Sequence, residues 1–539
     1  MRLQIVFICV IALGGSAPAC AGRARDLPAS HFFQTSDHCI ACHSNLHSAA
    51  GEDVSIGYNW RATIMANSSR DPYWQAGVRR AVIDHPTAQA AIEDTCSTCH
   101  MPMARFEAAA QGAQGKVFAN LAPAAGAASN PFAIDGVSCT VCHQIQPENF
   151  GQHASFDGGF VLDKTTPIGE RHIFGPNPVD AGRQSVMRSA AAFEPDESSH
   201  VQRSELCATC HTLYTEALDE AGERIGQLPE QMPYLEWRNS RYRDAQSCQS
   251  CHMPLVAGEM RAASVLGEPR SHFSQHVFRG GNAFVLGLIN SHRGELEAAA
   301  LPQELDAEIA RTVEFLGTET ARVSVQSPRR QGGRLAFDVD VENLSGHKFP
   351  TAYPSRRAWL HVKVSDAAGT TLFESGALEA DGSVAGNDND ADGGRFEPHY
   401  DEIRSADQVQ IYEPIMVDPE GRVTTDLLAA VRYAKDNRLL PKGFDKSKVP
   451  DDVAVRGAAR EDANFVGGGD RVRYAVELPK SGSGPLRVDV SLMFQPIGRR
   501  WAENLRPYDS METRRFVAYY DEAARSSAYL VAHASAEIP

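Results

Sequence analysis

Cys39-Ile-Ala-Cys42-His43 is the first of five copies of one pattern, Cys-X-X-Cys-His, that decides how the first half of this chain folds. The other copies are Cys96-Ser-Thr-Cys99-His100, Cys139-Thr-Val-Cys142-His143, Cys207-Ala-Thr-Cys210-His211 and Cys248-Gln-Ser-Cys251-His252. The chain has only 12 Cys and 19 His among 539 residues. That composition gives roughly 0.01 copies by chance, so the repetition has a chemical cause.

The pattern is that of covalent haem c attachment. Its two thiols form thioethers with the vinyl groups of one porphyrin, and the following imidazole ligates the iron. A zinc site would need four ligands where each copy offers three, and a redox Cys-X-X-Cys needs a βαβ context that the sequence lacks. The sequence therefore predicts five haems c, with His43, His100, His143, His211 and His252 as proximal ligands.

The first residues have the layout of a secretory signal peptide. Arg2 precedes an apolar run from Leu3 to Leu13, and small residues end at Ala19-Cys20-Ala21. Cleavage after residue 21 predicts a periplasmic or secreted protein. A lipoprotein anchor at Cys20 is the alternative. No later stretch reaches 18 apolar residues, so we expect no transmembrane helix.

The chain is acidic, with a formal net charge of −16. Such a charge argues against nucleic acid as a partner. It favours other redox proteins, such as cytochromes or a membrane quinol-linked complex, although it can equally serve solubility. The oligomeric state stays open.

The cysteines divide the mature chain into parts. Residues 22–293 hold all five motifs and are rich in Gly, Pro, Asn and Ser, which predicts a pentahaem domain of short helices and irregular segments. Helices are expected over 71–84 and 86–94, where Pro72 and Pro86 suit first-turn positions. Leu305, Ile309 and Val313 then predict a helical connector over 294–318.

The cysteine-free half shows strand patterns. Apolar residues alternate with polar ones over 335–341, 472–478 and 486–494. This period of two predicts an all-β, antiparallel, immunoglobulin-like sandwich over 319–505. A partly helical insertion is expected over about 426–462, and a C-terminal tail over 506–539.

Five irons also call for sixth ligands. Four histidines lie in turns rich in Gly, Pro or Asn, or close to a motif, and are the candidate distal ligands: His85, His200, His276 and His347. Met65 could ligate through its thioether. Its alternative role is that of an apolar core residue.

One loop resembles a calcium site. Asp388, Asp390 and Asp392 stand at alternate positions before Gly393, as calcium loops require. The twelfth position is His399 instead of a bidentate Glu, so an ordinary solvated acidic turn is the alternative.

Several phrases carry a resemblance to a known family. They are Arg70-Asp71-Pro72-Tyr73-Trp74, Asp135-Gly136-Val137-Ser138-Cys139, Ser204-Glu205-Leu206-Cys207, Pro229-Glu230-Gln231 with Tyr234 and Glu236-Trp237, Gly280-Gly281-Asn282, and Gly346-His347-Lys348-Phe349-Pro350-Thr351. The chain resembles a bacterial multihaem cytochrome c family related to the tetrahaem cytochrome of ammonia oxidisers, in a pentahaem variant with a C-terminal sandwich. The resemblance implies a periplasmic electron carrier with closely packed, mostly six-coordinate haems.

Two further functions stay open at this point. A haem oxidoreductase could act on a small nitrogen or sulfur oxide at one five-coordinate iron. Related pentahaem nitrite reductases generally mark that iron with Lys in place of the motif His, and every motif here ends in His. The sandwich could also be an interaction module that docks the haem domain to a partner.

Overall fold

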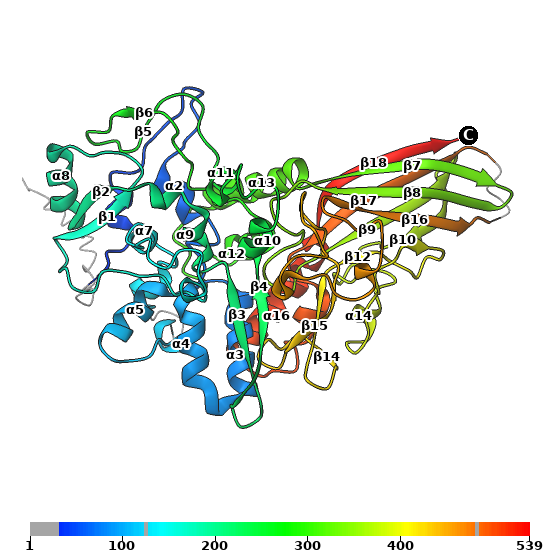
Figure 1. Ribbon diagram of the computed structural model, residues 1–539, viewed down its shortest axis with the longest axis horizontal. Coiled ribbons are helices and arrows are strands. Elements are labelled where there is room, and N and C mark those ends of the chain that lie inside the picture. Colours follow the sequence, from blue (N-terminus) through cyan, green and yellow to red (C-terminus); the bar gives the residue numbers. More distant parts are fainter. Residues whose placement is uncertain (1–31, 123–127, 480–483) are drawn as a thin grey trace, which may run out of the picture.

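The computed structural model describes residues 32–122, 128–479 and 484–539. The predicted signal peptide, residues 1–21, and the anchor alternative at Cys20 lie outside these ranges. Figure 1 shows an elongated molecule in which short helices and loops fill one end and long strands fill the other. We call residues 32–293 the motif half and residues 319–539 the sheet half.

The motif half consists of short helices joined by irregular segments. They are α1 (Asp37–Ile40), α2 (Ile56–Arg61), α3 (Pro72–Asp84), α4 (Gln89–His100), α5 (Pro102–Ala110), α6 (Pro131–Ile134), α7 (Cys139–Cys142), α8 (Ala181–Ala191), α9 (Ser204–Ala208), α10 (Pro233–Arg238), α11 (Cys248–His252) and α12 (Ala283–Ser291). Every Cys-X-X-Cys-His motif overlaps one of them.

The helix expected over 71–84 is confirmed as α3, and its start has a local cause. The Asp71 carboxylate accepts hydrogen bonds from the backbone N–H groups of Tyr73 and Trp74, and Pro72 occupies the first helical turn. The segment expected over 86–94 begins as a short 3₁₀ turn and continues as α4.

Strands in the motif half form small pairs. β1 (Arg171–Gly175) pairs parallel with β2 (Phe193–Glu197), whereas β3 (Leu213–Leu218) with β4 (Arg224–Gln231) and β5 (Met260–Arg261) with β6 (Pro269–Arg270) are antiparallel. The predicted connector helix is α13 (Pro302–Glu319), which buries Leu305 and Leu316. Of the helices in the described residues, none is both long and apolar enough to cross a membrane.

Two sheets make up most of the sheet half. Their strands are β7 (Ala321–Gln331), β8 (Arg334–Asn343), β9 (Arg357–Asp366), β10 (Thr371–Ser375), β11 (Glu402–Ile403), β12 (Ile411–Tyr412), β16 (Gly469–Glu477), β17 (Leu486–Gln495) and β18 (Tyr529–Ile538). One sheet has the order β10-β9-β17-β18, with β12 also on β9, and the other has β11-β16-β8-β7. Neighbouring strands are antiparallel except β11 and β16. The three alternating runs of the sequence are confirmed as β8, β16 and β17.

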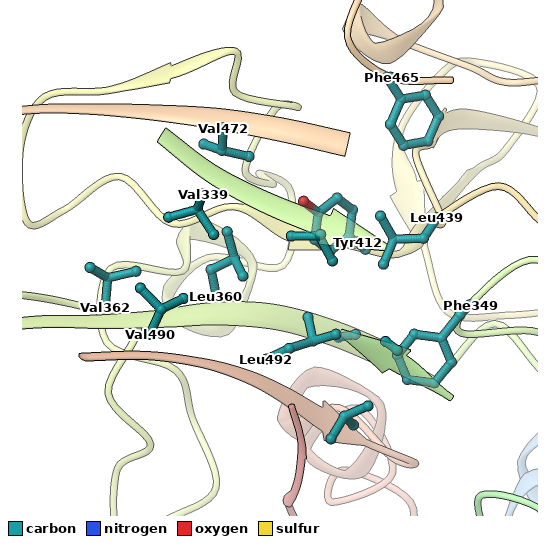
Figure 2. Packing of buried hydrophobic residues seen from close by; sticks show 14 of the residues in the cluster. Val339, Phe349, Leu360, Val362, Tyr412, Leu439, Phe465, Val472, Val490 and Leu492 are labelled. Carbon is teal, nitrogen blue, oxygen red and sulfur yellow. The ribbon is translucent and has the colours of Figure 1, made fainter. Parts of the chain in front are cut away.

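Alternation places one face of each sheet in a shared core. Val339 of β8 and Val472 of β16 point toward Val362 of β9 and Val490 of β17, and all four are fully buried (Figure 2). Burying such a side chain contributes about 1.5–3 kcal/mol, so the apolar half of each alternating pattern holds the two sheets together.

Two segments differ from the sequence-based boundaries. The region 426–462, expected as a partly helical insertion, contains the strand β15 (Arg432–Asp436) and two 3₁₀ turns. Strand β15 pairs with β13 (Pro414–Val417), which also pairs with β14 (Val423–Thr424). The region expected as a tail, 506–539, forms α16 (Met511–Ala523) and the edge strand β18.

Helix α16 returns from the sheet half to the motif half and packs on α3. Arg79 forms an ion pair of 2.9 Å with Glu512, and the rings of Tyr73 and Phe516 lie 5.0 Å apart, centre to centre. The C-terminal helix therefore contacts the motif half, and the two halves share a hydrophobic cluster.

Candidate haem-binding site

One continuous cavity connects the five motifs. It has a volume of about 1950 Å³ and is lined by all ten motif cysteines and all five motif histidines. Pockets for a single small molecule have volumes of about 300–1,000 Å³. The cavity therefore has room for more than one ligand, and the cysteines sit where covalent attachment requires them.

Four motif imidazoles are held in the same way, each donating its Nδ1–H to a backbone carbonyl. The pairs are His43 with Ala262 (2.7 Å), His100 with Ser68 (3.0 Å), His143 with Phe174 (2.6 Å) and His252 with Arg279 (2.6 Å). A carbonyl oxygen can only accept, so Nδ1 carries the proton and Nε2 keeps its lone pair. That tautomer is the one that ligates a metal through Nε2.

Burial favours the neutral form of four motif imidazoles, those of His100, His143, His211 and His252. It lowers the pKa of His100 and of His252 to about 4, and it lowers the pKa of His143 and His211 as well. Only a neutral imidazole has a lone pair to offer iron, so the local environment favours the ligating form.

Two of the predicted distal histidines face motif histidines. The ring centres of His143 and His276 lie 6.3 Å apart with planes 19° from parallel, and those of His252 and His347 lie 6.2 Å apart with planes 12° from parallel. Two metal–nitrogen bonds of about 2.0 Å, plus roughly 1.1 Å from each nitrogen to its ring centre, give about 6.2 Å. The spacing is that of two imidazoles on opposite sides of one iron.

The second ring of each pair is also oriented by its Nδ1. His276 contacts the carbonyl oxygen of Ser274 at 3.2 Å, and His347 that of Lys348 at 2.8 Å. Burial lowers the pKa of His276 to about 3. Both rings therefore keep Nε2 for a partner inside the cavity.

The other three candidate distal ligands have different surroundings. His85 lies outside the cavity, 3.7 Å from the Asp426 carboxylate. Both nitrogens of His200 are engaged, with Ser198 Oγ at 2.6 Å and the Ile145 carbonyl at 2.7 Å. Met65 lines the cavity.

Cysteines of different motifs meet in pairs. Thiols of different motifs are near enough to shift each other's pKa values in the pairs Cys39–Cys139, Cys99–Cys210 and Cys207–Cys248. Burial raises the pKa of Cys142, and the charge of Cys210 raises it further. The first motif thus adjoins the third, and the fourth adjoins the second, the third and the fifth.

A half-buried cation lines the same cavity. The Arg356 guanidinium donates to the Thr351 carbonyl at 3.0 Å and forms no ion pair within the described residues. Burial lowers its pKa to about 10, and the charge of Asp71 opposes that shift. An arginine in this position fits an anionic group such as a porphyrin propionate.

The three carboxylates of the calcium-like loop point to different partners. Asp390 is buried and receives both Arg357 Nη1 and Nη2 at 2.9 Å. Asp388 pairs with Arg395, and Asp392 accepts the Gly394 N–H at 2.9 Å. The described residues therefore do not bring these side chains together around an ion.

His399, Asp462 and Asp470 are residue types that bind metals, but the protonation state of His399 does not suit a metal ligand. His399 Nε2 lies 3.0 Å from Asp462 and 4.0 Å from Asp470. Nδ1 accepts from the side-chain amides of Gln410 (2.8 Å) and Asn437 (3.1 Å). Backbone N–H groups that donate to both amide oxygens fix the amide orientations. Nε2 must then carry the proton, and it donates to Asp462 in place of binding a metal.

Sequence reasoning missed the groups that orient the imidazoles. They are backbone carbonyls, which any residue type supplies, so no side-chain pattern could reveal them. Arg356 was also missed, because one arginine in a loop carries no signal until its burial is known.

Comparison with known proteins gives a fold. No protein-family model matches the chain, and no curated protein matches it. The structure is similar to the crystal structure of a penta-heme cytochrome c552 from Thermochromatium tepidum, with a TM-score of 0.52 and 16% sequence identity. The match covers 94% of this chain and 99% of that one. At this identity the similarity concerns the fold, which is shared over nearly the whole length.

Proposed function

We propose that the chain is a pentahaem c-type cytochrome that carries electrons between redox partners outside the cytoplasm. The observation that carries the proposal is the single cavity lined by all five attachment motifs. The fold shared with a penta-heme cytochrome and the resemblance to the tetrahaem cytochrome of ammonia oxidisers support it. The predicted signal peptide supports a periplasmic or secreted location.

The motif residues would hold the haems. The ten cysteines form the thioethers, and His43, His100, His143, His211 and His252 are the proximal ligands. His276 would hold the iron of the third haem together with His143, and His347 that of the fifth together with His252, because the ring centres of each pair lie 6.3 and 6.2 Å apart. When bound, each haem supplies one-electron chemistry. The chain orients the ligands, keeps them neutral and excludes water.

The contacts between motifs suggest a path. Haems attached at adjoining thiols lie side by side, which gives a run from the first to the third to the fourth motif. The second and the fifth both join at the fourth. Haems placed side by side in this way would suit electron carriage, which needs no open iron.

A mass measurement with spectroscopy tests the proposal. Natively matured protein should carry five covalent haems, and low-temperature electron paramagnetic resonance should show low-spin signals for the third and fifth irons. The His276→Ala and His347→Ala variants should each convert one iron in five to high spin. A polypeptide without five attached haems would refute the function. Five haems with unchanged spectra in both variants would refute only the ligand assignment.

The sheet half would then do more than dock partners. We propose that its paired sheets form a sandwich of the immunoglobulin-like type, and that the loop before β9 reaches back to deliver His347. Cytochromes or a membrane quinol-linked complex are the proposed partners. A sheet half that only docks partners would leave all five haem spectra unchanged in His347→Ala, whereas the proposed ligand role predicts a change at one haem.

A further inference from the structure

We infer that Glu236 is a positioning residue for the fifth haem: its carboxylate, from the motif half, binds the backbone of Lys348, the sheet-half residue whose carbonyl orients His347. This inference rests on the proposed ligand role of His347. The contacts that carry it are the most buried charged ones at the junction of the two halves.

Glu236 binds the His347 loop directly. It lies on α10 and is fully buried. Its Oε2 accepts the Lys348 backbone N–H at 3.2 Å and the Thr351 hydroxyl at 2.5 Å. The Lys348 carbonyl accepts the Nδ1–H of His347 at 2.8 Å. One residue thus stands between the carboxylate and the ligand imidazole.

Three more charges fix Glu236 in turn. Arg438 Nη1 lies 3.0 Å from Glu236 Oε1, and its other nitrogens bind Asp436 at 2.8 Å. Asp436 binds Lys348 Nζ at 2.6 Å. All four side chains are at most 6% exposed, and the two cations balance the two anions. We call Glu236, Lys348, Asp436 and Arg438 the junction network.

The neighbouring backbone leaves the loop little freedom. A Cβ on Gly346 would lie 3.3 Å from the Trp237 ring, and the Tyr242 hydroxyl donates to the Leu344 carbonyl at 3.0 Å. Helix α10 and the residues after it therefore contact the loop both before and after His347.

The carboxylate also acts on the site through its charge. Glu236 binds the backbone N–H of the residue next to His347, so its negative charge lies close to the proposed ligand. A buried negative charge stabilises ferric iron, which is one charge more positive than ferrous iron, and so lowers the reduction potential. Glu236 should therefore hold the fifth haem at a lower potential than an amide in its place would.

The test is Glu236→Gln in the natively matured full chain. We expect one of the five midpoint potentials to rise and one low-spin signal, the one that His347→Ala removes, to broaden or partly convert to high spin. Asp390→Asn is the matched control, because it also neutralises a buried carboxylate that is paired with an arginine. This pair, Asp390 with Arg357, lies within the sheet half. It should leave all five potentials unchanged.

Thr351→Val covers the case in which Glu236→Gln does not mature. It removes one hydrogen bond to the same carboxylate and no charge, and it should produce a smaller change at the same haem, with Thr351→Ser restoring the parent spectrum. If Thr351→Val and any folded Glu236→Gln protein match Asp390→Asn, the inference fails. If His347→Ala itself changes no haem, the ligand assignment fails instead.

Discussion

Lys348 is a fully buried charge of the junction network, and its removal should have a large effect on stability. The side chain is 0% exposed, and Nζ lies 2.6 Å from Asp436 Oδ2. The Lys348→Met variant keeps a chain of similar length but leaves two carboxylates facing Arg438 alone. The network then holds one buried negative charge that nothing balances.

The size of the effect follows from that imbalance. Removing one partner of a buried ion pair costs about 3–5 kcal/mol, because the other charge stays buried and unpaired. In a unit the size of the sheet half, 1 kcal/mol lowers the unfolding temperature by about 2–4 °C. Lys348→Met should therefore lower it by about 6–20 °C, measured by differential scanning calorimetry of the haem-loaded protein.

An exposed pair gives the control. Arg487 and Asp489 lie 2.9 Å apart on β17 with side chains 54% and 27% exposed. Such pairs contribute little, so Arg487→Gln should leave the unfolding temperature unchanged. A shift in Lys348→Met no larger than that of Arg487→Gln would refute the reasoning from burial.

Three other measurements follow from the structure. Burial raises the pKa of Asp470 from 3.8 to about 7. The contribution of this group to stability is therefore greatest below pH 4 and declines as the pH rises toward 7. The urea midpoints measured at pH 5 and at pH 8 should differ less in Asp470→Asn than in the parent protein. Zinc should not bind at His399, because Nε2 carries the proton, and calorimetric titration of parent and His399→Ala protein should give the same result. Gly136→Ala should destabilise by about 1–3 kcal/mol more than Gly112→Ala: both glycines have positive φ, but only at Gly136 would a Cβ lie 2.6 Å from backbone oxygens. Equal unfolding temperatures for the two alanine variants would contradict this.

The sequence revealed the parts of the structure that depend on local spacing. The five motifs, the start of α3 at Pro72 and the alternating pattern of β8 each lie within a dozen residues. Pairings between distant residues were not readable. His200 and His276 are equally plausible ligands by their local sequence. In the structure both ring nitrogens of His200 are hydrogen-bonded, to Ser198 and to a backbone carbonyl, whereas the His276 ring faces His143 across the cavity.

The elements after residue 505, expected as a tail, also depend on a pairing between distant residues. Residues after 505 contain a helical stretch and an alternating strand, but only the register of β18 against β17 shows that they complete a sheet. The junction network was equally hidden, because Glu236 and Lys348 are charged residues that composition assigns to the surface.

The meeting of three neighbours at the fourth motif has a consequence for how many partners the protein can serve. In the proposed cytochrome a simple row of five haems would have two ends, whereas the layout inferred from the neighbouring thiols would have three, at the first, second and fifth motifs. Two ends can thus be occupied by a donor and an acceptor while the third stays available. Damage to the fourth centre would separate all three termini from one another, whereas damage to any end would leave a working route between the other two.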